Sequence, residues 1–167
     1  MKPNAKTTSH SFQCIDALEV SLSIEKQGFI FYDKAAKSAM DPGVQAIFLR
    51  LADEEKEHIQ SLQNTARFLQ PALTKKSFPS TSKAENFIKN ELEGKVFPTF
   101  ENDRGDVKSD LEALNIGIEA ERRSIEVLVR LITDEKKIDV RAIFNHLLAE
   151  ERKHLSALEE LKQTLVK

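Results

Sequence analysis

Six residues in this chain form two copies of one pattern, a glutamate followed later by Glu-x-x-His. The first copy is Glu25, Glu55 and His58, and the second is Glu121, Glu151 and His154. The second copy lies 96 residues (121 − 25) after the first, and the internal spacing of the two copies is identical. Carboxylates together with imidazoles suit iron or manganese, with zinc as an alternative, better than they suit calcium. The pattern therefore predicts a site for two metal ions.

The repeat is not confined to these six residues. The same shift places residues 17–18 (AL) on residues 113–114, and residues 47–48 (IF) on residues 143–144. The two halves are therefore interpreted as an internal duplication. Each half contributes one glutamate and one Glu-x-x-His motif to a pseudo-symmetric site.

The six residues lie on apolar stripes that have the period of an α-helix. Hydrophobic residues recur in steps of three and four along four segments, which is typical of antiparallel bundles. The stripes comprise Ile15, Leu18, Leu22, Glu25, Phe29, Tyr32 and Ala36; Val44, Phe48, Leu51, Glu55, His58, Leu62, Thr65 and Leu69; Leu111, Leu114, Ile118, Glu121, Ile125, Leu128 and Ile132; and Val140, Phe144, Leu147, Glu151, His154, Leu158, Leu161 and Leu165. Because such a stripe faces the core, the six polar residues are expected to be buried.

Burial of four carboxylates requires compensating charge. An ionised carboxylate buried alone costs on the order of several kcal/mol, so it protonates, pairs or binds a cation. Two divalent cations would balance the four negative charges. The heights agree as well, because Glu25 and Glu55 lie 16 and 14 residues from a turn near Asp41 (41 − 25 and 55 − 41). These offsets correspond to about 24 and 21 Å along antiparallel helix axes.

The two predicted hairpins, residues 12–69 and 108–165, are joined by a long connection over residues 70–107. A connection of this length spans the height of a bundle and makes the second and third helices parallel. The sequence therefore predicts an all-α protein, a ferritin-like antiparallel four-helix bundle with a long crossover between helices 2 and 3. Residues 11–167 form this domain, and residues 1–10 are expected to be a flexible tail.

Local signals mark the helix ends. Asp41 is the expected N-cap of the second helix, with Pro42 at the first helical position. Ser109 and Glu112 predict a capping box for the third helix, with Asp106 as an alternative cap.

The crossover has features of its own. Residues 82–94 are expected to form a short helix that Ser82-x-x-Glu85 opens and Gly94 closes. Four phenylalanines of the crossover are expected to cover an open flank of the bundle rather than to contact a substrate. They are Phe78, Phe87, Phe97 and Phe100.

Other polar residues have simpler interpretations. Five glutamates are expected on solvated helix faces, namely Glu54, Glu57, Glu119, Glu126 and Glu150. His10 lies in the tail and His146 lies off the stripe, so neither is expected to be a ligand. Tyr32 lies two turns from Glu25, where it either donates its hydroxyl to a ligand carboxylate or simply packs in the core. Its duplicate position is Leu128, which confines any such role to one half.

Composition narrows the function classes. The 167 residues fit one domain with a sizeable core, and the formal net charge of −2 offers no basic patch for nucleic acid. Cys14 is the single cysteine, which excludes an intrachain disulfide and a four-cysteine metal site. The sequence has neither a signal-peptide pattern nor an apolar run long enough for a membrane span. We expect a cytoplasmic protein without nucleic-acid or membrane partners.

Three segments resemble the rubrerythrins of the ferritin-like superfamily. They are residues 24–32 (IEKQGFIFY), 52–58 (ADEEKEH) and 149–154 (AEERKH). The resemblance implies a di-iron site in which Glu55 and Glu151 bridge the two metals. It further implies that Glu25 with His58 holds one iron and Glu121 with His154 the other, and that these six residues are catalytic through the metals. A homodimer is common among such relatives.

Two departures from the family pattern are visible. Peroxidase-type rubrerythrins have a further glutamate three residues after the third-helix ligand, where this chain has Ser124. They also carry a cysteine-rich rubredoxin domain, which a single cysteine cannot build. The resemblance therefore implies an external electron donor, either a rubredoxin-like protein or a flavoprotein.

Three functions follow from these observations. The leading hypothesis is a di-iron oxidoreductase, a non-haem peroxidase or oxidase that reduces hydrogen peroxide or dioxygen and protects against oxidative stress. The alternative is an iron-binding ferroxidase or an iron-storage protein. A further alternative is a metal-free helical interaction module, against which the intact ligand set in both halves argues.

Overall fold

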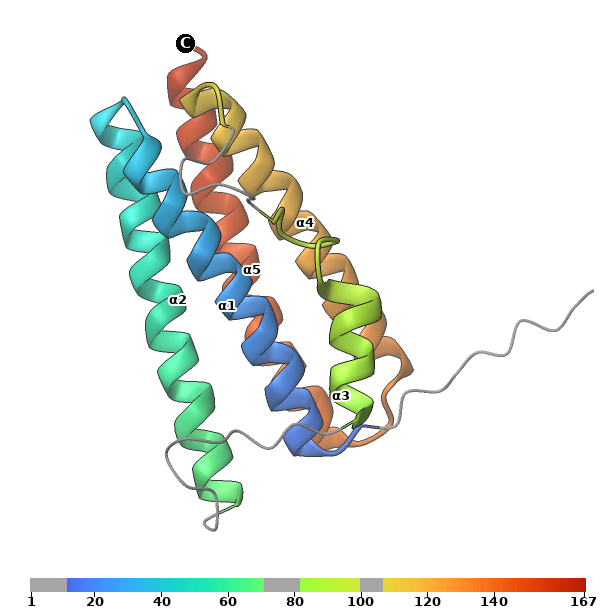
Figure 1. Ribbon diagram of the computed structural model, residues 1–167. Coiled ribbons are helices and arrows are strands. Elements are labelled where there is room, and N and C mark those ends of the chain that lie inside the picture. Colours follow the sequence, from blue (N-terminus) through green and yellow to red (C-terminus); the bar gives the residue numbers. More distant parts are fainter. Residues whose placement is uncertain (1–11, 71–81, 100–106) are drawn as a thin grey trace, which may run out of the picture.

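The computed structural model describes residues 12–70, 82–99 and 107–167, so the predicted tail over residues 1–10 lies outside the described part. Four long helices dominate: α1 (Cys14–Ser38), α2 (Pro42–Leu69), α4 (Asp110–Asp134) and α5 (Ile138–Leu165). α1 and α2 form one antiparallel hairpin, α4 and α5 form the other, and α2 runs parallel to α4 (Figure 1). The predicted all-α four-helix bundle, with its parallel second and third long helices, is confirmed.

The helix starts follow the predicted signals. Asp41 caps α2, because its carboxylate accepts hydrogen bonds from the backbone N–H groups of Gly43 and Val44. Ser109 caps α4 by accepting from the backbone N–H of Glu112 at 3.1 Å. The capping box is only half formed, since the Glu112 carboxylate accepts from the N–H of Lys108 instead of Ser109. The alternative cap, Asp106, lies outside the described residues.

The core lies along the predicted stripes, which end before the helices do. Phe48, Leu51, Phe144 and Leu158 are buried at the centre of the bundle. The predicted core positions at the helix ends, by contrast, are exposed, namely Thr65, Leu69, Leu111 and Leu165. Leu69, Leu111 and Leu165 lie in terminal turns, where there is less neighbouring chain to cover them, whereas at Thr65 the adjacent Ala66 is the buried residue instead.

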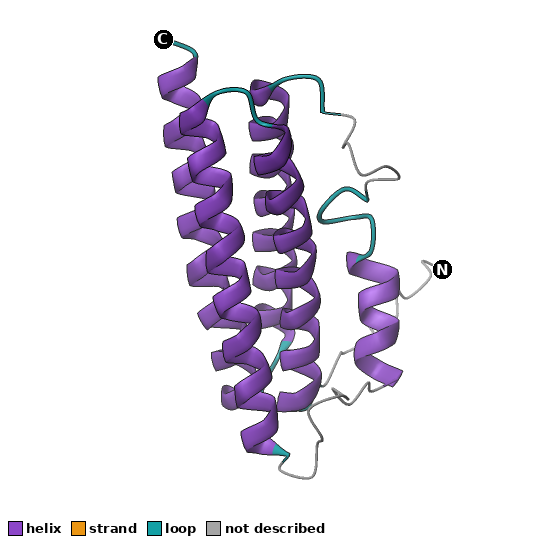
Figure 2. Ribbon diagram, turned by 60° about the vertical axis from the view of Figure 1, so that its left-hand side comes forward, coloured by secondary structure: helices purple, strands orange, loops and turns teal. Residues whose placement is uncertain are grey.

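The crossover contributes a separate helical element on one flank. α3 (Ser82–Phe87) continues into the π-helical turn η1 (Ile88–Leu92), and Gly94 follows with a positive φ of 66°. Figure 2 shows this element beside the four long helices, and it packs against α1. Its buried face consists of Ala84, Phe87 and Leu92. The predicted short helix is therefore present.

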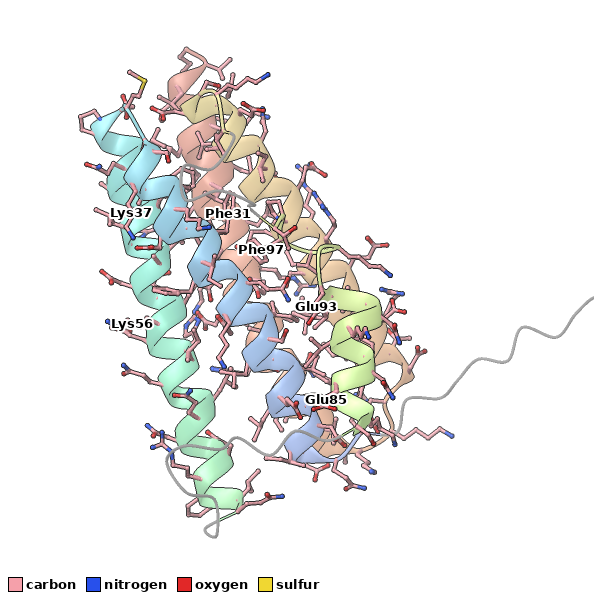
Figure 3. The ribbon with its side chains drawn as sticks, in the orientation of Figure 1. Phe31, Lys37, Lys56, Glu85, Glu93 and Phe97 are labelled. Carbon is pink, nitrogen blue, oxygen red and sulfur yellow. The ribbon has the colours of Figure 1, made fainter. Side chains whose placement is uncertain are left out.

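The crossover phenylalanines in the described residues cover the bundle as predicted. Phe87 packs edge-on to Phe12, with ring centroids 5.6 Å apart. Phe97 is buried against Phe31 and Tyr32, with ring centroids 5.8 and 6.1 Å away, and Figure 3 shows Phe31 and Phe97 close together between the helices. Phe78 and Phe100 lie outside the described residues.

The helices of the described part do not include one that is both long and apolar enough to cross a membrane. Their outer faces carry the charges. Lys56, for example, follows Glu55 directly in the chain, yet it projects from the outer side of α2 (Figure 3).

The two hairpins are tied at one end by Asp110, whose carboxylate accepts hydrogen bonds from the backbone N–H groups of Met40 and Asp41.

Candidate metal centre

The four long helices bring the six predicted ligand residues to one place in the core. α1 contributes Glu25 and α4 contributes Glu121, whereas α2 and α5 contribute one Glu-x-x-His motif each. The i and i+3 spacing of that motif puts both of its side chains on one helix face. All four carboxylates are 2% exposed or less. The convergence that the sequence requires is therefore present in the fold.

The ligand atoms fall into two overlapping groups that share Glu55. One group contains Glu55, Glu121, Glu151 and His154, and the other contains Glu25, Glu55 and His58. Within each group, one atom per residue lies within 4.8 Å of all the others. Two adjacent positions for metal ions, joined by a common carboxylate, match this geometry.

The two histidines face the carboxylates with their Nδ1 atoms. His154 Nδ1 lies 3.4 Å from Glu55 Oε1, 3.6 Å from Glu121 Oε1 and 3.7 Å from Glu151 Oε2. His58 Nδ1 lies 3.4 Å from Glu25 Oε2 and 4.0 Å from Glu55 Oε2. The two oxygens of Glu55 therefore face different histidines, as a bridging carboxylate would. The imidazole rings are stacked, with centroids 5.9 Å apart and an interplanar angle of 17°.

Every one of these six residues carries at least one buried polar atom without a hydrogen-bond partner. Seven such atoms come from the cluster: Glu25 Oε2, Glu55 Oε2, His58 Nδ1, Glu121 Oε2, Glu151 Oε2, His154 Nδ1 and His154 Nε2. Buried polar groups normally have a hydrogen-bond partner, and each group left without one costs about 1–3 kcal/mol. A cluster of such atoms from four helices is the arrangement that bound cations would satisfy, so the residues present fit a metal site.

Two further side chains hold the carboxylates in place. The Tyr32 hydroxyl donates a hydrogen bond to Glu121 Oε1, so a residue of the first hairpin orients a carboxylate of the second. Tyr32 also packs, since its ring stacks on Phe48 with centroids 6.0 Å apart. The sequence offered donation and packing as alternatives, and the structure shows both. Ser124 Oγ donates to Glu151 Oε1 at 3.1 Å.

Gly28 and Ser124 occupy equivalent positions under the 96-residue shift, and both lie beside the cluster. A Cβ added at Gly28 would lie 2.5 Å from Glu55 Oε1. The absent side chain thus makes the space that the Glu55 carboxylate occupies. One candidate bridging carboxylate is therefore next to an open glycine position, whereas the other, Glu151, is held by a serine hydroxyl.

Burial dominates the electrostatics of two carboxyls. It raises the pKa of Glu25 from 4.5 to about 7, although the neighbouring His58 works in the opposite direction. Burial, together with the charge of Glu151, also raises the pKa of Glu121 well above its ordinary value. Burial would raise the pKa of Glu151 as well, but its neighbours His154, Glu121 and Ser124 outweigh the burial and lower the pKa.

The histidines compensate for part of the negative charge. Burial alone would lower the pKa of His154, but its neighbours Glu121 and Glu151 outweigh burial and raise the pKa to about 10. The carboxylate of Glu25 likewise raises the pKa of His58. Protons on imidazoles and carboxyls therefore supply the positive charge that metal ions would supply in their place.

An outer pair of carboxylates was not identified from the sequence. His154 Nε2 lies 3.3 Å from Glu54 Oε2, and His58 Nε2 lies 3.7 Å from Glu150 Oε2. Each glutamate thus faces the histidine of the other hairpin and can fix its ring orientation. The prediction that Glu54 and Glu150 lie on solvated helix faces holds only in part, because both are half-buried and each has one carboxylate oxygen facing an imidazole. The sequence did contain a signal for this pair, because the 96-residue shift superimposes Glu54 on Glu150.

The remaining polar residues lie where the sequence placed them. Glu57, Glu119 and Glu126 are exposed, and Glu119 pairs with Arg122 at 2.8 Å. His146 is exposed and lies off the core stripe. His10 lies outside the described residues.

The family model for rubrerythrin matches residues 16–162 of this chain. No curated protein matches the sequence. Among solved structures, a hypothetical protein from Pyrococcus furiosus is similar over 99% of this chain and 97% of its own length, with a TM-score of 0.61 and 17% identity. A DUF305 fragment from Deinococcus radiodurans is similar over 95% of this chain and 97% of its own, with a TM-score of 0.57 and 11% identity.

A third solved structure, from Anabaena variabilis, is a two-domain protein with DJ-1/ThiJ/PfpI-like and ferritin-like domains. It is similar over 90% of this chain and 39% of its own length, with a TM-score of 0.54 and 18% identity. At these identities the three structures speak for the fold alone, and the third agrees with the predicted ferritin-like bundle.

Proposed function

Because this chain belongs to the rubrerythrin family, we propose that it is a di-iron carboxylate oxidoreductase that reduces hydrogen peroxide or dioxygen. The observation that carries the proposal is the set of six buried, unpartnered ligand atoms, one from each of six residues on four helices. Structural burial alone gives no reason for so many unsatisfied groups at one point. Manganese or zinc are the alternative metals for the same donor set.

The proposed ligand roles follow the distances. Glu25 and His58 would hold one ion, because their Oε2 and Nδ1 atoms lie 3.4 Å apart. Glu121 and His154 would hold the other, with Oε1 and Nδ1 3.6 Å apart. Glu55 would bridge the two ions because its oxygens face different histidines. Glu151 would be the second bridge, with Oε1 already engaged by Ser124.

Two ferrous ions bound there would supply the two electrons that reduction of an O–O bond requires. The chain itself supplies the surroundings. Phe48 and Leu51 lie two turns and one turn before Glu55, and Phe144 and Leu147 stand in the same relation to Glu151. All four are buried, so they exclude bulk water from this side of the cluster.

Tyr32 keeps a proton beside the centre. Burial and the adjacent Glu121 raise the pKa of its hydroxyl well above the ordinary value, so Tyr32 stays a donor at neutral pH. Reduction of hydrogen peroxide to water consumes protons as well as electrons. The Tyr32 hydroxyl, which donates to Glu121 Oε1, therefore holds a proton next to the candidate ligands.

The proposal includes an external electron donor, a rubredoxin-like protein or a flavoprotein, since the chain has one cysteine and could not ligate a rubredoxin-type iron with it. It also includes a homodimer as the working assembly. Pull-down from the native cell after reduction, and sedimentation of the purified protein, address these two points separately.

The direct test begins with metal-free protein loaded anaerobically with ferrous iron. We expect two ions per chain, and mixing with hydrogen peroxide in a stopped-flow instrument should oxidise them within seconds. Absence of peroxide-dependent oxidation on that timescale would remove the enzymatic proposal and leave metal binding standing. A melting temperature that neither iron nor chelator changes would instead favour the metal-free module.

Iron storage is separated by continued titration. A storage protein would take up many ions per chain and scatter light as a large assembly, whereas the proposed enzyme saturates at two. Metal analysis of the protein purified anaerobically from its own cell identifies the native metal.

A further inference from the structure

The two ends of the candidate centre differ in their access to solvent. The side chain of His58 is 23% exposed, whereas that of His154, its duplicate, is 1% exposed. A duplicated site would be expected to be equally buried at both ends. The difference therefore reflects residues that the two halves do not share.

A small pocket of about 30 Å³ leads to the more exposed end. It lies between α1, α2 and α5, and it reaches from the exposed His146 to the buried Glu25. Glu25 and His58 both line it, and each has an unpartnered polar atom there, Oε2 and Nδ1 respectively. A pocket of this volume accommodates about one water molecule or one ion.

The walls of this pocket are duplicated, but its rim is not. Ile143 and Leu147 correspond to Ile47 and Leu51 under the 96-residue shift, so the apolar sides are the same in both halves. His146, however, corresponds to Arg50. Arg50 Nε lies 3.5 Å from Glu54 Oε1, so the rim of the His154 end carries a permanent positive charge where the His58 end has an imidazole.

The rim at the His58 end has the chemistry of a cation ligand instead. His146 and Glu150 are four residues apart on α5, hence on one face of that helix, and both line the pocket. Lys153 pairs with Glu150 Oε1 at 2.8 Å, which leaves Oε2 directed to His58 Nε2 at 3.7 Å. An exposed imidazole and a carboxylate are suitable ligands for a first-row divalent cation.

We propose that metal ions enter the centre through this pocket, and that His146 and Glu150 bind the incoming divalent cation before Glu25 and His58 receive it. The opposite end stays closed to cations, because the side chain of His154 is only 1% exposed there. This inference rests on the proposed metal centre and adds to it one direction of loading and a transient binding site on the surface.

The test is the rate at which metal-free protein takes up Co(II), followed by its visible absorbance in a stopped-flow instrument under anaerobic conditions. His146→Arg copies the residue of the other half and should slow loading by about tenfold or more. His146→Gln, which removes the imidazole without adding charge, should slow it by a smaller factor. Both variants should still reach two ions per chain, because neither changes a ligand of the centre.

Arg50→Gln is the matched control, because it changes the equivalent position at the closed end and should leave the loading rate unchanged. Equal loading rates for wild type and His146→Arg would overturn the inference, and so would an effect of Arg50→Gln as large as that of His146→Arg. Normal saturation at two ions would then leave the proposed metal centre intact. No Co(II) uptake by the wild type would overturn both proposals. Circular dichroism checks that each variant is folded, as expected for changes at exposed positions.

Discussion

Gly28 of α1 lies so close to Glu55 of α2 that an added Cβ atom would be 2.5 Å from Glu55 Oε1. The contacted atom is the end of a flexible side chain, so a methyl group at position 28 displaces the carboxylate rather than the helix. The close approach of α1 at Gly28 thus limits where the carboxylate of Glu55, a candidate bridging ligand, can lie. Gly28 is a positioning residue for Glu55.

We predict that Gly28→Ala weakens metal binding by about tenfold or more while the metal-free protein keeps or gains stability. Alanine is favoured over glycine within a helix by about 1 kcal/mol, which offsets the small shift of Glu55. Chelator competition measures the affinity and thermal melting measures the stability. Gly117→Ala is the control, because its Cβ would meet only Leu158 and Phe31, so metal affinity should not change. An unchanged affinity in Gly28→Ala would contradict the role assigned to this glycine.

Tyr32→Phe removes the hydroxyl that donates to Glu121 and keeps the ring that packs on Phe48. Because Glu121 is fully buried, it loses a donor that water cannot replace. We expect the free energy of unfolding of the metal-free protein to fall by about 1–3 kcal/mol, measured by urea denaturation. Equal stability of the variant and the wild type would show that the hydroxyl matters little to Glu121.

Glu54→Gln and Glu150→Gln test the outer carboxylates that face His154 and His58. Loss of either charge should lower metal affinity by about 10–100-fold, since a carboxylate partner orients an imidazole ligand and raises its basicity. Metal titration against a chelator of known affinity provides the measurement. Glu57→Gln, a change at an exposed position of the helix that carries Glu54, should leave metal affinity unchanged. A similar loss in all three variants would point to general electrostatics instead.

The stability of the metal-free protein should fall as pH rises from about 5 to about 10. The pKa of Glu25 is raised from 4.5 to about 7, and that of His154 from 6.5 to about 10. In both cases the folded state binds more protons than the unfolded state across the window between the two values. Stability is therefore greatest below each unfolded pKa and is lost as pH rises through the folded pKa. Urea denaturation of metal-free protein at a series of pH values checks the slope.

The stability that bound metal adds to the protein should, in contrast, increase as pH rises. Metal ions compete with protons for the same ligand atoms, so the gain in melting temperature on loading should grow with pH. A gain that is independent of pH would indicate that the ions bind elsewhere than at these six residues.

The sequence predicted the helices and the buried side of each because both depend on local features. The period of the apolar stripe fixes which face of a helix is buried, and it put Glu55 and His58 on that face. Turn residues such as Asp41 and Pro42 fixed the hairpin, and equal offsets from the turn fixed the common height of Glu25 and Glu55. At the helix ends the same pattern failed at Leu69 and Leu165, because burial there depends on whether a neighbouring helix extends equally far.

The sequence by itself determined the six candidate ligands, their register and their origin in two equivalent halves. Only the tertiary structure decided how the halves meet: that Tyr32 reaches Glu121, that Glu54 faces His154, and that a pocket joins His146 to Glu25 at one end while His154 is buried at the other. The physical reason is that helical periodicity relates residues within one helix. Contacts between hairpins depend instead on the rotation and spacing of whole helices, which are set by packing among side chains far apart in the chain.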